Sequence, residues 1–348
     1  MKGTNGMNSF NRMNRMNGTH TFRIPRRRPA AAVALASAAL VAALLPSLGQ
    51  PPDTSPRSGS APRTATCRDG TGAAACSLYG PAAGLGNGTI RAYSAYEGGK
   101  PEELGISLTA SALTGLPTSP TDGKHCFDAD ADGSRDPVHE CVGGHSRELA
   151  LPAAPPASTG PALPFQWALF NWNPYGHNPH GRYDVPHFDV HFYLVPQQVR
   201  AGIRTGSCAL LIACDQLAAA AKPVPDAYLP AGYPASSPQT AEGAMGAHLD
   251  SRPPTTGTLS GQTLIYGAYA GELVFIEPML TKAFLERQRT AAGHRTCEPV
   301  PQPAAWRTPG WYPTRYCTAY RPDQGDYTVS LTDFVPSAGV RPLVAAGR

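Results

Sequence analysis

The stretch that decides the fold reads PHFDVHFYLVP and occupies residues 186–196. Aromatic and β-branched residues dominate it and a proline bounds each end, so it is predicted to be a β-strand. Side chains alternate between the two faces of a strand. One face therefore carries four apolar side chains, those of Phe188, Val190, Phe192 and Leu194. The other face carries His187, Asp189, His191 and Tyr193, which form a candidate site or a buried hydrogen-bond network.

Strand signals flank this stretch on both sides. The further predicted strands span residues 89–96, 104–108, 165–172, 263–269 and 272–276, with two more inside 312–334. Glu97-Gly98-Gly99-Lys100 is a hairpin signal between the first two, and Glu277-Pro278 is expected to end the strand that begins at residue 272. The sequence thus predicts several antiparallel strands.

Helices are predicted only in short pieces. They follow Thr109 and cover residues 208–222 and 281–289, the last with Thr281 as its N-terminal cap. Gly and Pro make up 36 and 37 of the 348 residues without a fixed period, which indicates many loops. The expected fold class is mainly β, a β-rich α+β protein with an antiparallel sheet or barrel-like core, a few short helices and long loops.

The N-terminus has the pattern of an export signal. The run Arg26-Arg27-Arg28 precedes an apolar stretch from Ala30 to Leu45, and Ser47-Leu48-Gly49 offers a cleavage site. We expect residues 1–49 to be a cleaved signal peptide and the mature protein to be secreted or held in the cell envelope. The alternative is an uncleaved membrane anchor, since the apolar stretch nearly reaches the ~18–20 residues that span a bilayer.

The remaining chain is predicted to hold one domain. Residues 50–66 are rich in Pro, Ser and Thr and are expected to be a disordered linker. Residues 67–336 are expected to form a single β-rich globular domain, followed by a C-terminal tail over 337–348.

The net charge gives no support for a nucleic-acid partner. Seven of the 29 basic residues lie in residues 1–49, which contain no acidic residue, and this leaves 22 basic against 25 acidic residues in the rest. A nucleic-acid-binding domain would instead carry a basic face. The sequence leaves open whether the protein forms a homo-oligomer or binds a small-molecule ligand.

All eight cysteines follow the leader and are expected to form disulfides, since an even count is typical of exported proteins. Proximity in the sequence predicts four local pairs, each stabilising by roughly 2–4 kcal/mol. The predicted pairs are Cys67–Cys76, Cys126–Cys141, Cys208–Cys214 and Cys297–Cys317.

An Asp-rich loop resembles the first half of an EF-hand calcium loop. Its predicted Ca²⁺ ligands are Asp128, Asp130, Asp132 and Asp136, with Gly133 at the sharp turn. The usual glutamate at the twelfth position is replaced by His139, and Glu140 follows one residue later. The alternative is an exposed turn, because Asp and Gly favour turns for conformational reasons.

Long segments of the chain are similar to a known protein family. They are GNGTIRAY from Gly86, ELGISLTASALTGLP from Glu103, NWNPYGHNPHGRYDVPHFDVHFY from Asn171, LPAGY from Leu229, MGAHL from Met245, YGAYAGELVFIEPMLTKAFL from Tyr266 and YTVSLTDFV from Tyr327. Over residues 86–335 the chain resembles a family of largely uncharacterised exported bacterial proteins with a PHFDxHFY signature. The resemblance implies export but no particular reaction.

Strand geometry limits which residues can share one metal ion. Alternate residues lie about 6.6 Å apart and residues four apart about 13 Å, so Asp189 can share an ion with only one of His187 and His191. His248 and Glu277, both in the matched segments, are the candidate third and fourth ligands. Imidazole with carboxylate suits Zn²⁺ or a similar divalent ion. The spare histidine is then a hydrogen-bonded support or a proton carrier.

Other interpretations of these residues stay open. In one interpretation, Asp189 and its flanking histidines are a purely structural hydrogen-bond network in a structural or ligand-binding envelope protein. In another, the site takes an organic ligand. A zinc-dependent hydrolase would use Glu277 or a histidine as base. The order His187, Asp189, His248 also fits a two-histidine, one-carboxylate iron site, which suits an exported protein poorly. The loop 173–181 carries His177 and His180, which are expected to be exposed bystanders.

Overall fold

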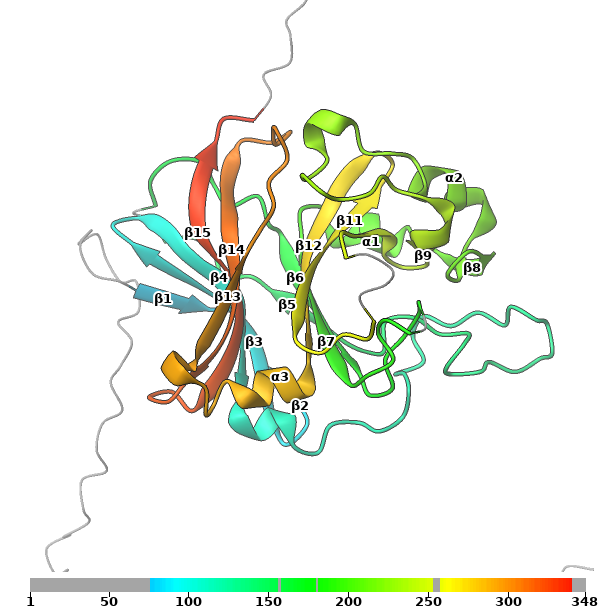
Figure 1. Ribbon diagram of the computed structural model, residues 1–348, viewed down its shortest axis with the longest axis horizontal. Coiled ribbons are helices and arrows are strands. Elements are labelled where there is room, and N and C mark those ends of the chain that lie inside the picture. The colour runs from blue at the N-terminus through cyan, green and yellow to red at the C-terminus, as the bar shows by residue number, and fades with distance from the viewer. Residues whose placement is uncertain (1–75, 156–157, 180, 253–256, 340–348) are drawn as a thin grey trace, which may run out of the picture. The chain divides into compact units, whose positions relative to one another are not determined.

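The computed structural model describes residues 76–155, 158–179, 181–252 and 257–339, which form two antiparallel β-sheets with a few short helices (Figure 1). The predicted β-rich fold class is therefore confirmed. The predicted signal peptide, the linker, Cys67 and His180 lie outside the described residues, as does most of the predicted C-terminal tail.

The first sheet has the strand order β1-β3-β4-β15-β14-β13, with β2 paired to β3. Its strands are β1 (Cys76–Tyr79), β2 (Ala83–Leu85), β3 (Gly88–Glu97), β4 (Lys100–Thr109), β13 (Arg295–Pro299), β14 (Gly310–Arg321) and β15 (Asp326–Ser337). The predicted hairpin joins β3 to β4, and its turn uses Gly98 and Gly99 at positive φ angles of 57° and 78°. Positive φ costs glycine nothing, which explains the Gly-Gly pair.

The second sheet has the order β5-β6-β7-β12-β11-β10-β9. Its strands are β5 (His145–Ala150), β6 (Trp167–Asn173), β7 (His187–Tyr193), β9 (Ala241–Glu242), β10 (Gly246–Asp250), β11 (Gln262–Tyr269) and β12 (Glu272–Thr281). The central stretch of the sequence is thus β7, hydrogen-bonded to β6 on one side and β12 on the other. All seven residues of β7 are buried.

The hydrophobic core lies between the two sheets. The apolar face of β7 supplies Phe188, Val190 and Phe192, each 0% exposed, as the alternation predicted. The first sheet contributes Ile106 and Val329 among others to the same cluster. Full burial of side chains of this size stabilises a fold by about 1.5–3 kcal/mol each. The polar face of β7 therefore points away from the first sheet.

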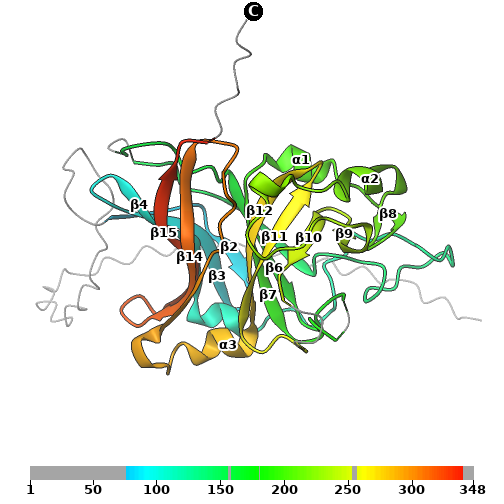
Figure 2. The same ribbon diagram turned by 45° about the horizontal axis from the view of Figure 1, so that its top comes forward.

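The polar face of the second sheet is flanked by the long connection from β7 to β10. This segment contains α1 (Gln197–Ala201), β8 (Thr205–Cys208), α2 (Leu217–Ala220) and short 3₁₀ helices at Cys214–Gln216, Asp226–Tyr228 and Pro238–Thr240. In Figures 1 and 2 its labelled elements α1, α2 and β8 lie on the side of the second sheet opposite to the first. A polar face that would otherwise be open to water is enclosed in this way.

The helices are shorter than the sequence predicts. The predicted helix after Thr109 is a 3₁₀ helix over Ala110–Leu113, and a further 3₁₀ helix spans Ala292–His294. The helix capped by Thr281 is confirmed as α3 (Lys282–Arg287), where Thr281 Oγ1 accepts a hydrogen bond from the Phe284 N–H at 3.1 Å. None of the described helices is long and apolar enough to cross a membrane.

The predicted helix over 208–222 is wrong in its first half. Cys208 ends a strand, and Ala209 and Leu211 take positive φ angles of 45° and 56°, which no right-handed helix accommodates. The Cys208–Cys214 disulfide closes this loop, so that helical backbone begins only at Cys214. The alanine-rich composition favours a helix over the whole segment, but the residues inside the Cys208–Cys214 loop are not helical.

Several strands also differ from the sequence prediction. β12 does not end at Glu277-Pro278 but continues to Thr281, so Pro278 lies inside a central strand. β5 covers residues 145–150, where no strand was predicted, and the same holds for β1, β2, β8, β9, β10 and β13. The other predicted strands are present with shifted ends, and the last of them, predicted over residues 327–331, extends to Ser337.

Three of the predicted disulfides are confirmed. They are Cys126–Cys141, Cys208–Cys214 and Cys297–Cys317. Cys76 is also disulfide-bonded, and its predicted partner Cys67 lies outside the described residues. Disulfides of this kind persist in oxidising compartments and indicate an extracytoplasmic environment.

Candidate metal centre

The polar face of β7 meets further polar side chains from the neighbouring strands. On β6, Asn173 pairs with His187 and Asn171 with Asp189 in the strand register. On β12, the pairs Phe275–Tyr193 and Met279–Asp189 place Glu277 between them, in the row of His191. The histidines and carboxylates of this face divide into two groups of three, called site 1 and site 2 below.

Site 1 consists of His177, His187 and Asp189. The Nε2 atom of His187 lies 3.2 Å from Asp189 Oδ1, and that of His177 lies 3.3 Å from Asp189 Oδ2. Both Nδ1 atoms face main-chain oxygens, at 2.7 Å for His187 with Val185 O and 2.6 Å for His177 with Asn178 O. Because a carbonyl only accepts, each Nδ1 carries a proton, and both Nε2 atoms are directed at the carboxylate.

Asn173 supports the carboxylate of site 1. Its Nδ2 donates to Asp189 Oδ2 at 2.7 Å and lies 3.3 Å from His187 Nε2. Asp189 Oδ1 is buried and has no hydrogen-bond partner. Site 1 is therefore partly satisfied as a hydrogen-bond network, with one carboxylate oxygen left over.

Site 2 consists of His191, His248 and Glu277. His191 Nε2 lies 3.4 Å from Glu277 Oε1, and His248 Nε2 lies 3.9 Å from Glu277 Oε2. The His191 side chain is 0% exposed and that of Glu277 only 2%. Both ring nitrogens of His191, Nδ1 of His248 and Oε2 of Glu277 are buried without a hydrogen-bond partner. Of these atoms, His191 Nε2 and Glu277 Oε2 lie where the three side chains meet, and the two Nδ1 atoms lie on the far sides of their rings.

Glu277 faces His191 because the register of β12 with β7 is the same on both sides of it, and Pro278 interrupts only the pairing at this point. A proline has no N–H to give to a neighbouring strand, which makes it rare inside a sheet. The register of β12 with β7 runs to Ile276–Phe192 and resumes at Met279–Asp189, and it omits Glu277 and Pro278. The pairing is therefore interrupted beside site 2.

Aromatic rings form one wall of site 2. The ring centroid of Phe275 lies 4.8 Å from that of His191 and 5.4 Å from that of His248. Phe275 occupies the space above Gly267, where an added Cβ would lie 2.1 Å from its ring. Trp167 stacks on Tyr193 at 4.1 Å and continues this wall. Gly267 is therefore required for the position of Phe275.

A cavity of about 150 Å³ borders both sites, and His177, His248 and Glu277 line it. Its other lining residues include Tyr183, Glu242, Asp250, Ile265 and Met279. A second cavity of about 90 Å³ shares His177 and Glu242 with the first. A metal ion at site 2 would therefore have an open ligand position toward this cavity.

Burial and neighbouring carboxylates shift the pKa values of all three residues of site 2. Burial raises the pKa of Glu277 well above its usual value, and the charges of Asp189 and Glu242 raise it further. Burial lowers the pKa of His191 to about 3 and also lowers the pKa of His248, against the opposing charge of Glu242. Both imidazoles are thus neutral and keep a lone pair for a cation, which would stabilise the Glu277 carboxylate.

The electrostatics of site 1 differ. Burial by itself would raise the pKa of Asp189, but the charges and hydrogen bonds of His187 and His177 hold it well below its usual value. Burial likewise opposes protonation of His177, whose pKa is nevertheless raised to about 9 by the hydrogen bond and charge of Asp189. The Asp189 carboxylate thus attracts a positive charge, which either a proton on His177 or a metal ion can supply.

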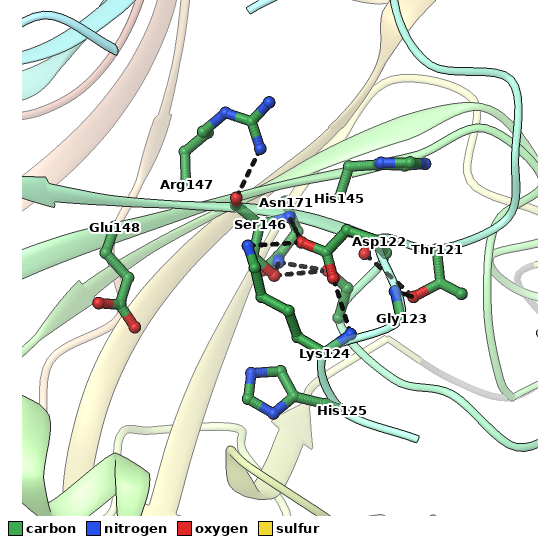
Figure 3. A network of polar contacts seen from close by, with 12 residues as sticks. Thr121, Asp122, Gly123, Lys124, His125, His145, Ser146, Arg147, Glu148 and Asn171 are labelled. Carbon is green, nitrogen blue, oxygen red and sulfur yellow. Dashed lines mark hydrogen bonds and ion pairs between the residues drawn. The ribbon is translucent and has the colours of Figure 1, made fainter. Parts of the chain in front are cut away.

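A separate polar network anchors the start of β5 (Figure 3). Asp122 Oδ2 accepts from Lys124 Nζ at 2.8 Å and from the Ser146 N–H at 3.0 Å. Asn171 Nδ2 donates to Ser146 Oγ at 3.0 Å, which links this network to the row of Asp189 on β6. These contacts are structural, although Asn171 Oδ1 is buried without a hydrogen-bond partner.

The Asp-rich loop gathers a different set of residues from the one predicted. Asp128, Asp130 and Glu140 lie together, while Asp132 accepts hydrogen bonds from Ser134 and Asp136 pairs with His139. Glu140 accepts main-chain hydrogen bonds from Ala129 at 2.6 Å and Asp136 at 2.9 Å. Asp132 and Asp136 thus lie outside the group, and Glu140 joins it. Binding of Ca²⁺ here stays a prediction.

The predicted metal ligands are all on the same face, but they do not form one set. His187 and Asp189 belong to site 1, whereas His191, His248 and Glu277 belong to site 2. The expectation that His187 and His191 do not share an ion agrees with this division.

Two residues near the sites were missed by the sequence analysis. His177, expected to be a bystander, contacts Asp189, and Glu242 Oε2 lies 3.7 Å from His248 Nδ1. The only sequence signal for His177 was its position in a loop directly before the central strand, and Glu242 had none.

Comparison of the chain with protein-family models, with curated proteins and with solved structures found no match. The resemblance to the PHFDxHFY family therefore stays a prediction, and the proposed function rests on the geometry of the two sites.

Proposed function

We propose that this protein binds a divalent transition-metal ion, such as Zn²⁺, through His191, His248 and Glu277. The observation that carries the proposal is that the Nε2 atoms of two histidines meet the Glu277 carboxylate, and that His191 Nε2 and Glu277 Oε2 are buried there without a hydrogen-bond partner. An unpaired buried polar group costs about 1–3 kcal/mol, and more for a charged group, so two such atoms in one ligand group call for a ligand.

The distances at site 2 are compatible with one ion. Atoms that share a tetrahedral ion with bonds of about 2.1 Å lie about 3.4 Å apart. The two distances from the histidine Nε2 atoms to Glu277 are 3.4 and 3.9 Å. Two imidazoles and one carboxylate are a ligand set that Zn²⁺ accepts with a fourth position open.

The test is the metal content of the exported chain, purified without a histidine tag and analysed by mass spectrometry. Glu277→Gln keeps the shape and removes the anionic oxygen, so it is expected to abolish binding at site 2. His145→Gln is the matched control, since His145 is also buried but contacts Ser119 instead of either site. Metal-free wild-type protein, or a Glu277→Gln variant with undiminished metal, would contradict the proposal.

Hydrolysis by a metal-bound water is the second candidate function. The cavity beside His248 and Glu277 favours it, because an open ligand position that a water or substrate can reach is typical of catalytic zinc sites. Chromogenic ester and phosphoester substrates test it. Turnover that disappears with a chelator and returns with Zn²⁺ would support hydrolysis, whereas metal-loaded protein without turnover on these substrates would favour a binding role.

We also propose that the protein is exported. Its disulfides support an oxidising compartment, and the pattern of residues 1–49 supports a cleaved leader. N-terminal sequencing of protein recovered outside the cytoplasm tests this, with an expected start close to Gln50. Recovery of the intact leader in the membrane fraction would show an anchor instead.

A further inference from the structure

Site 1 has the features of a second, independent metal centre. Its three residues share no ligand with site 2, so the inference does not rest on the proposed function. Its histidines reach Asp189 from different directions, since His187 belongs to β7 and His177 to the preceding loop. Both residues contact the carboxylate, His187 at Oδ1 and His177 at Oδ2.

The histidine tautomers of site 1 suit a metal ion. Each Nδ1–H donates to a main-chain carbonyl, which orients the ring and leaves Nε2 as the free ligand atom. Metal-bound histidines in proteins usually make such a bond with the other ring nitrogen. Both Nε2 atoms then lie within 3.3 Å of an Asp189 oxygen, close to the spacing of ligands around one ion.

The backbone fixes His177 in this position. Gly176 takes a φ of 77°, and an added Cβ would lie 1.9 Å from Tyr183 O. Only glycine fits this turn, which brings His177 next to Tyr183 and over the end of β7. In this position the imidazole Nε2 of His177 contacts Asp189 Oδ2.

The carboxylate itself points to a cation. Asp189 is 3% exposed, its Oδ1 has no hydrogen-bond partner, and Asn173 holds Oδ2 at 2.7 Å. Among the described residues no lysine or arginine forms an ion pair with Asp189. A divalent ion between the three side chains would satisfy both Nε2 lone pairs and Oδ1 at once.

We propose that His177, His187 and Asp189 hold a second divalent transition-metal ion, so that one sheet face carries two separate metal centres. Asn173 is a positioning residue that orients the Asp189 carboxylate. Because no ligand bridges the sites, each ion is expected to bind in the absence of the other.

The experiment counts metal ions in the full exported chain and in variants of each site. Wild-type protein is expected to hold two equivalents of Zn²⁺ or Co²⁺ after removal of free metal. The site 1 variants His177→Gln and Asp189→Asn should each retain one equivalent of metal, and the site 2 variant Glu277→Gln should also retain one. The double variant His177→Gln with Glu277→Gln should retain none. His145→Gln should keep both, and circular dichroism of each variant establishes that it is folded.

The outcomes separate this inference from the proposed function. A wild-type protein with one equivalent, lost in Glu277→Gln and kept in folded His177→Gln, would overturn the second centre and leave the proposed function standing. One equivalent lost in His177→Gln and kept in Glu277→Gln would support site 1 and contradict site 2. Full metal content in both site 1 variants would also overturn the inference.

Discussion

His248 presents its two ring nitrogens to two different carboxylates. Nε2 faces Glu277 at 3.9 Å, and Nδ1 faces Glu242 at 3.7 Å. At 3.7 Å the Nδ1–Glu242 contact is an ion pair and not a hydrogen bond. A carboxylate beside the other nitrogen of a metal-bound histidine orients the ring and increases its basicity, and Glu242 is the residue placed for this role at site 2.

Glu242→Gln is therefore expected to weaken metal binding at site 2 by about 10–100-fold, the usual effect of losing such a partner. Occupancy at saturating metal should remain. Competition with a chelating dye measures the affinity, and Glu272→Gln, which changes an exposed glutamate of β12, is the control. An unchanged affinity would remove Glu242 from the site.

Gly267 provides a second test at the scale of one residue. Gly267→Ala would place a Cβ 2.1 Å from the Phe275 ring, which packs on both histidines of site 2. We expect a loss of about 1–3 kcal/mol in unfolding free energy from overpacking, together with weaker metal binding. Denaturant unfolding and metal titration measure the two effects. Gly84→Ala, where an added Cβ meets nothing within 4 Å, should change neither.

Among the elements, β5 depends on a carboxylate that ties its start to the preceding loop. Burial of Asp122 is outweighed by hydrogen bonds from Lys124 and Ser146, so the pKa of Asp122 is lowered. A carboxyl group whose pKa is lower in the folded state stabilises the fold at pH values above its pKa in the unfolded chain, which is about 3.9 for aspartate. This stabilisation is lost as the pH falls from there through the pKa of the group in the folded state.

Asp122→Asn is accordingly expected to lower the unfolding free energy at pH 7. The difference from wild type should shrink as pH falls below about 4, when the wild-type carboxylate also becomes protonated. Urea unfolding at pH 7 and at a series of acidic pH values measures this. A difference that stays constant with pH would show that the charge of Asp122 has no part in anchoring β5.

The Asp-rich loop between β4 and β5 offers a further test at this scale. A structural Ca²⁺ ion at Asp128, Asp130 and Glu140 would raise the melting temperature, because an ion that binds only the folded state stabilises it. Calorimetry with added Ca²⁺ and with a calcium chelator measures this, and Asp128→Asn should abolish the effect. A melting temperature that neither reagent changes would exclude the calcium prediction.

At the scale of the whole molecule, the proposed metal ions should contribute to stability. The ligands come from β7, β10, β12 and the loop before β7, so an ion at either site holds distant segments together. Removal of metal with EDTA is expected to lower the melting temperature of wild-type protein. The double variant His177→Gln with Glu277→Gln should not respond, and a wild-type protein that does not respond would argue against both sites.

The sequence by itself determined the local features of this protein. Alternation along residues 186–196 placed Phe188, Val190 and Phe192 in the core and the His–Asp–His row on the opposite face. Proximity along the chain gave the three disulfides that the structure describes. Both inferences succeed because side-chain periodicity and short-loop closure are properties of a few neighbouring residues.

Only the tertiary structure decided how the polar residues are grouped. The strand order β6-β7-β12-β11-β10 brings Glu277 and His248 to His191, and not to Asp189 as the sequence analysis expected. The turn at Gly176 gives Asp189 a different partner, His177, which the sequence did not distinguish from an exposed histidine. Sheet order, register and loop path depend on contacts between distant segments, and a local pattern of residues does not encode those contacts.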